Sequence, residues 1–67
     1  MRVNDMVTGE TLTGTPSAAL IEASEAEGET GAVAAYLDDA GVWQYVQTGD
    51  ESRMERLGHA VRTVWVD

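Results

Sequence analysis

His59 is the one histidine in this chain of 67 residues, and the sequence contains no cysteine. A catalytic triad would have to join this histidine to Ser17, Ser24 or Ser52 and to a carboxylate. No nucleophile-elbow spacing surrounds any of these serines. His59 follows a glycine that we expect to end a helix, and an imidazole interacts favourably with a helix C-terminus. We therefore predict that the protein is not an enzyme.

Adjacent carboxylates at Asp38–Asp39 and Asp50–Glu51 are the candidate metal ligands. A calcium-binding EF-hand needs alternating acidic residues followed by glycine, and a histidine zinc site on a helix needs a pair of histidines at helical spacing. Neither pattern occurs in the sequence. Acidic residues are common at turns and helix caps for structural reasons. We expect no metal and no other cofactor.

Net charge is the most distinctive property of the sequence, because 12 acidic residues face only 4 basic ones and the formal charge is −8. The electrostatic field of such a negative charge repels nucleic acids and anionic membranes and attracts basic surfaces. One interpretation is a solvated acidic face that keeps a small protein soluble. The other is a decoy whose carboxylates occupy a basic groove meant for nucleic acid. The acidic residues that would contact such a partner are Glu22, Glu25, Glu29, Asp38 and Asp39.

Aromatic residues form a second candidate surface. On paired strands, Trp43, Tyr45 and Trp65 would share one face of a sheet. Exposed there, they would anchor a partner or a second copy of the chain, whereas a covering helix would make them core residues. We include Trp43 and Tyr45 among the candidate partner-binding residues.

Local patterns in the first half of the chain predict the elements that must position these side chains. They indicate strands over 3–8 and 11–13 and a helix that starts at Pro16 and continues with good helix formers over 18–27. Gly9–Glu10 provides a two-residue turn with glycine first, as a type II′ hairpin requires. Thr15 would be the N-cap of the helix and Pro16 its first residue, where the missing N–H costs nothing.

The second half is predicted to contain strands over 32–37, 42–47 and 61–66 and a helix over 51–58. Residues 38–41 form a turn, and a partner strand before it is the economical interpretation of 32–37, for which a helix is the alternative. Asp50 would cap the second helix, with Met54 and Leu57 facing inward. The order is ββαββαβ. We predict an α+β fold in a single domain over 1–67, with two short helices on one face of a small mixed or antiparallel sheet.

No window approaches the roughly 20 apolar residues of a membrane-spanning helix. The residues 1–5 lack the apolar region of a secretory signal. We expect a cytoplasmic protein with no membrane partner.

The stretch Thr8–Pro16, followed by a helix, resembles the openings of small phage and mobile-element accessory proteins, some of which are anti-CRISPR or other anti-defence inhibitors. The resemblance covers about a quarter of the chain. It implies a short, acidic and enzymatically inert protein, and no individual functional residue is carried over from it.

The leading hypothesis is therefore a non-enzymatic inhibitor or interaction protein of phage or mobile-element origin. It would bind the basic, nucleic-acid-binding surface of a protein or nucleoprotein complex such as a CRISPR effector, without contacting nucleic acid itself. The alternative is a self-associating structural or regulatory accessory protein, a homodimer without nucleic-acid mimicry.

Overall fold

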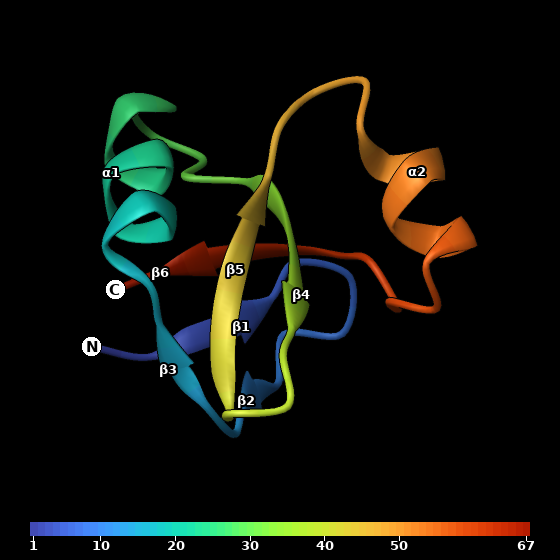
Figure 1. The fold of residues 1–67 in the computed structure, drawn as a ribbon. Coiled ribbons are helices and arrows are strands. Elements are labelled where there is room, and N and C mark those ends of the chain that lie inside the picture. Colours follow the sequence, from blue (N-terminus) through green and yellow to red (C-terminus); the bar gives the residue numbers. More distant parts are fainter.

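The computed structural model describes all 67 residues and contains six strands and two helices (Figure 1). In chain order these are β1 (Val3–Asp5), β2 (Thr11–Leu12), β3 (Thr15–Pro16), α1 (Ala18–Ala26), β4 (Val33–Leu37), β5 (Val42–Val46), α2 (Glu51–Arg56) and β6 (Arg62–Val66). The strands form one mixed sheet in the order β2-β1-β6-β4-β5-β3. The predicted α+β class is confirmed, as is the strand interpretation of 32–37. The short strand β3 is an addition to the predicted order.

The two edges of this sheet are held close together by the chain itself. The edge strands β2 and β3 are separated in sequence only by Thr13 and Gly14. Three consecutive peptide units span at most about 11 Å, whereas the edges of a flat six-stranded sheet lie roughly 24 Å apart. The sheet must therefore curl. Figure 1 shows the result, with β4 and β5 crossing steeply over β1 and β6.

The inner face of the curled sheet carries the hydrophobic core. Strand alternation turns side chains from β1, β4, β5 and β6 toward the interior, and α1 adds one leucine. The core residues are Val3, Leu20, Val33, Ala35, Trp43 and Val64. Ser24, one turn after Leu20, is also buried. Its Oγ donates to the carbonyl of Gly31 (2.8 Å) and accepts from the N–H of Val66 (3.1 Å), which fixes α1 to β6.

Helix α1 begins two residues later than predicted. Its N-cap is Ser17, whose Oγ accepts from the N–H of Leu20 (3.2 Å). Thr15 and Pro16 instead form β3, which pairs parallel to β5 through the N–H groups of Thr15 and Ser17. The missing N–H of Pro16 falls between these two donors, on the free side of an edge strand, where proline is tolerated.

The β1–β2 hairpin also differs from its prediction. Strand β1 stops at Asp5 because the Oδ1 of this residue accepts from the N–H groups of Val7 (2.8 Å) and Thr8 (3.0 Å) and so bends the chain. The connection between the strands therefore covers residues 6–10, rather than the two-residue turn expected from the position of glycine. Gly9, with φ of +79°, closes the loop by donating to the Asp5 carbonyl.

Helix α2 lies outside the core and apart from α1. Figure 1 shows the two helices to the left and right of the β4–β5 hairpin. His59, after α2, stacks on Tyr36, which alternation with Ala35 places on the outer face of β4. Leu57, predicted to face inward, is 62% exposed, and α2 has no buried residue. Asp50 precedes the helix without a side-chain capping bond. Neither helix has the length and apolar character needed to cross a membrane.

Gly14 offers a test of the curled sheet. A Cβ atom at this position would lie 2.8 Å from both Leu37 Cδ1 and Trp43 Nε1, and its φ is +112°. We expect Gly14→Ala to lower the free energy of unfolding by about 2–4 kcal/mol, through left-handed backbone strain plus overpacking. Gly49→Ala is the control, because φ is +97° there but no atom lies within 4 Å, so only the backbone cost of about 1–2 kcal/mol remains. Urea unfolding curves measure both losses, and equal losses would contradict the close approach.

Candidate functional site

The acidic residues of α1 and its exit form a surface without compensating cations. Glu22, Glu25, Glu27 and Glu29 are all exposed, and no lysine or arginine occurs between residues 3 and 52. The molecule has two ion pairs, Arg2–Asp67 and Arg62–Asp5, and neither involves a glutamate. The remaining arginines, Arg53 and Arg56, are exposed on α2. Helix α1 therefore carries only negative charge, whereas α2 balances Glu51 and Glu55 with Arg53 and Arg56.

Asp38, in the β4–β5 turn, has a structural role. Its Oδ2 accepts from Nε2 of Gln44 (2.9 Å), and its Oδ1 accepts from the N–H groups of Ala40 and Val42 (2.9 Å each). The Gln44 amide, followed by the Val42 N–H, lowers the pKa of Asp38 below the ordinary value of 3.8. Both oxygens of this carboxylate therefore accept hydrogen bonds from within the chain. Its neighbour Asp39 is exposed and accepts no hydrogen bond.

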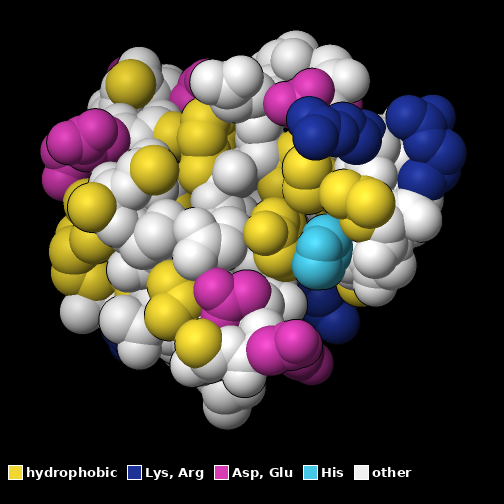
Figure 2. All heavy atoms as spheres, in the orientation of Figure 1, with side chains coloured by type: hydrophobic (Ala, Val, Ile, Leu, Met, Phe, Trp, Pro, Cys, Tyr) yellow, Lys and Arg dark blue, Asp and Glu magenta, His cyan; other side chains and the backbone are white.

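The predicted acidic residues do not converge on one patch. The 38–41 turn lies at the start of β5, next to Thr15, whereas α1 leads away from that point toward the other end of the molecule (Figure 1). Figure 2 shows the acidic side chains of this face in separate groups. The structure brings Glu22, Glu25 and Glu29 onto one helix and its exit and leaves Asp39 apart from them.

The three aromatic residues do not share a face. Trp43 and Tyr45 point inward, and Trp43 is only 4% exposed, with its Nε1 donating to the carbonyl of Thr13 (2.8 Å). Tyr45 is half-buried against the core. Trp65 alternates with the core residue Val64 and so points outward from β6. Of the two alternatives left open for Trp43, an exposed anchor or a core residue, the structure shows the core residue.

His59 has an aromatic rather than a polar environment. Its ring stacks on Tyr36 with centroids 4.1 Å apart and an interplanar angle of 25°, and the imidazole makes no side-chain hydrogen bond. No serine hydroxyl forms a hydrogen bond with it, and those of Ser17 and Ser24 bond to backbone groups. Elsewhere, no group of three or more histidine, aspartate or glutamate side chains lies close enough together to hold a metal ion.

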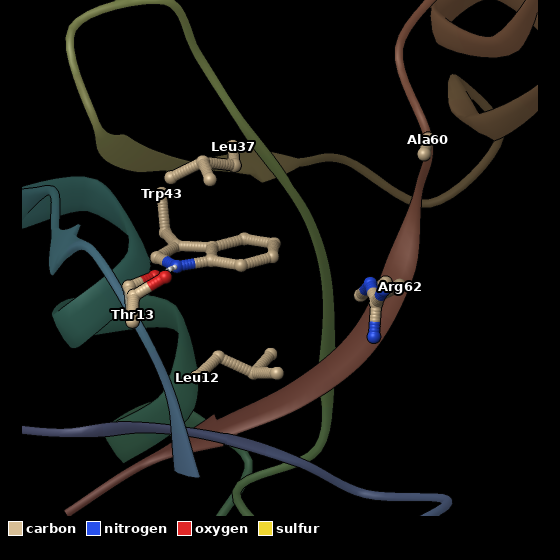
Figure 3. Close-up of a pocket in the computed structure, with 6 residues that line it drawn as sticks. All are labelled: Leu12, Thr13, Leu37, Trp43, Ala60 and Arg62. Atoms are coloured by element: carbon tan, nitrogen blue, oxygen red, sulfur yellow. Dashed lines mark hydrogen bonds between the residues drawn. The ribbon is translucent and has the colours of Figure 1, made fainter. Parts of the chain in front are cut away.

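A hollow of about 300 Å³ opens on the inner face of the sheet, and Trp43 is the one lining residue that the sequence analysis singled out. It is lined by Leu12, Thr13, Leu37, Trp43, Ala60 and Arg62. Figure 3 shows the Trp43 indole extending between Leu37 and Leu12, with Ala60 and Arg62 on the chain segment beyond the end of the ring. These residues come from four separate segments of the chain. The antiparallel register that pairs Leu37 with Trp43 is the one feature that hairpin prediction could have supplied.

Arg62 is the one charged residue of this hollow, and Asp5 holds it in place. NH1 of the half-exposed Arg62 donates to Oδ2 of Asp5 (3.0 Å), whose side chain is 7% exposed. The N–H groups of Thr8 and Val7, and then Arg62, lower the pKa of Asp5. Both Asp5 and Arg62 are on strands paired to one another, although 57 positions separate them in sequence. No local sequence signal marks this pair.

Comparison of the chain with protein-family models, with curated proteins and with solved structures found no match.

The hydrogen-bonded aspartates predict a dependence of stability on acid. A carboxyl whose pKa is lower in the folded state than in the unfolded chain stabilises the fold above about pH 4, and this stabilisation is lost as the pH falls through the folded-state pKa. The sites with lowered pKa values are Asp5, Asp38 and Asp67.

We therefore expect Asp38→Asn to reduce stability at neutral pH and to lessen the further fall below about pH 4, because the amide does not titrate. Urea unfolding midpoints across this pH range measure both effects. Asp39→Asn is the matched control, because it removes an adjacent exposed carboxylate that accepts no hydrogen bond. An equal pH dependence in the two variants would contradict the structural role of Asp38.

Proposed function

We propose that this protein is a non-enzymatic inhibitor that uses the acidic surface of α1 to occupy a basic, nucleic-acid-binding site on a protein or nucleoprotein complex. The observation that carries the proposal is the set of exposed carboxylates on α1 and its exit with no cation in contact. Glu22, Glu25 and Glu29 are the contact residues, with Asp39 as a separate outlying charge. Asp38 and Trp43 are excluded from the contact set by their internal hydrogen bonds and, for Trp43, by burial.

The spacing of these carboxylates suits a row of basic side chains. Residues three and four apart on a helix lie on one face with Cβ atoms about 5–6 Å apart, which gives Glu22 and Glu25 neighbouring positions. Lysine and arginine side chains that normally contact phosphates would meet carboxylates instead. The carboxylates of this surface repel one another and so destabilise the free protein. A basic partner offsets this repulsion when it binds, and the same charges then stabilise the complex.

A defence complex such as a CRISPR effector fits this description, because its nucleic-acid channel is strongly basic. The resemblance of Thr8–Pro16 to phage and mobile-element accessory proteins supports the same class of partner. Such an inhibitor would act in the host cytoplasm. Because the attraction acts between largely exposed charges, its range is set by ionic strength, about 8 Å under physiological conditions.

Charge reversal on α1 tests the proposal. The partner is first captured from host lysate at low salt and identified, and its affinity is then measured with purified components over a series of salt concentrations. We expect Glu22→Lys with Glu25→Lys to weaken binding by roughly tenfold or more and to flatten its salt dependence. Competing nucleic acid should displace the wild-type protein.

The control carries the same change in net charge elsewhere. Glu10→Lys with Glu55→Lys alters two exposed acidic residues outside α1 and should weaken binding much less. Equal weakening by the two double variants would show that net charge, and not the α1 surface, governs association. Recovery of nothing but the protein itself from lysate would favour the self-associating accessory protein.

A further inference from the structure

We propose that the hollow between β2, β5 and β6 is a binding site for a small organic carboxylate. Its apolar or aromatic body would lie against Leu12, Leu37 and Trp43, and its carboxylate would pair with Arg62. This site shares no residue with the acidic surface of α1, so the failure of one proposal would not contradict the other.

The size and lining of the hollow suit a small ligand. Its volume of about 300 Å³ is at the lower end of the range for small-molecule sites. This volume corresponds to on the order of ten water molecules, or one aromatic ring with a short side chain. Four of the six lining residues are hydrophobic. Leu37 remains 41% exposed beside the buried indole, so the chain itself leaves apolar surface open at this position.

The floor of the hollow is fixed before any ligand binds. The Trp43 N–H is already used by the carbonyl of Thr13, so the indole offers an apolar surface without an unsatisfied donor. Gly14 allows the backbone to pass the indole at a distance that any Cβ atom would prevent. A rigid aromatic wall needs little ordering when a ligand binds, and this lowers the entropic cost of the complex.

The positive charge of the Arg62 guanidinium favours a negatively charged ligand. Only its NH1 makes a hydrogen bond within the chain, to Asp5, which leaves the donors on Nε and NH2 free. Asp5 accepts two backbone N–H bonds as well, so it orients the guanidinium while its own charge is shared among three donors. A planar guanidinium with free N–H groups matches a carboxylate geometrically, and no acidic residue lines the hollow to oppose it.

The test uses 3-phenylpropionate and its uncharged analogue 3-phenylpropan-1-ol. Each compound is titrated into the isotopically labelled full chain and followed by NMR at the Leu12 and Leu37 methyl groups and the Trp43 indole N–H. We expect saturable shifts at these groups, with the carboxylate bound roughly tenfold more tightly than the alcohol, as one charge-assisted pairing provides. Absence of saturable shifts at these groups would overturn the proposal, as would equal affinity for the two compounds.

Two variants test the contacts separately. Arg62→Gln should abolish the preference for the carboxylate over the alcohol, whereas Arg56→Gln, which removes an exposed arginine on α2, should preserve it. Because Arg62→Gln also leaves Asp5 without its ion pair, Ala60→Phe provides a second route. The added ring would fill the mouth of the hollow from an exposed position and should block both compounds, while Ala40→Phe in the exposed turn should block neither. Unchanged binding in the Ala60→Phe variant would place the ligand elsewhere and overturn the assignment.

Discussion

The two-residue connection between β2 and β3 constrains the whole molecule. Thr13 and Gly14 must join the opposite edges of a six-stranded sheet, so the sheet curls until those edges approach each other. The connection is held against Trp43 by the indole hydrogen bond to Thr13 and by the close passage of Gly14. Curling gives this short chain an enclosed inner face, and α1 then has a concave surface on which to bury Leu20. It also leaves the hollow beside the same tryptophan.

The distribution of charge follows from this architecture. Asp5 and Asp38 are committed to hydrogen bonds that shape two turns, and Asp67 pairs with Arg2 where β1 and β6 meet. The glutamates of α1 have no such partners, because this helix exposes most of its surface and carries no basic residue. These three aspartates therefore stabilise the fold, whereas the glutamates of α1 supply negative charge that no cation offsets. This division is the physical basis for assigning partner binding to α1 and not to the β4–β5 turn.

The acidic surface and the hollow present different chemistry to different ligands. The acidic surface is open and convex, so its interactions are long in range and weakened by salt. The hollow is small and apolar, with a single oriented cation, so its interactions depend on shape and on one hydrogen-bonding group. Under the two proposals, the macromolecular contact lies on the helix side of the molecule and the small-molecule contact lies at the curled edge of the sheet.

Sequence alone determined the α+β class, the strands that flank the 38–41 turn, the placement of α1 within a residue or two of its ends, and the net charge, because each depends on local periodicity, turn residues or composition. It misplaced the start of α1, it left open whether Trp43 is buried, and it did not indicate the hollow. Pro16 fits either a helix start or an edge strand, and only pairing with β5 decided between them. Likewise, Arg62 and Asp5 meet only because β1 and β6 are neighbours in the sheet. Such long-range pairings are chosen by the packing of the whole chain, and no local pattern encodes them.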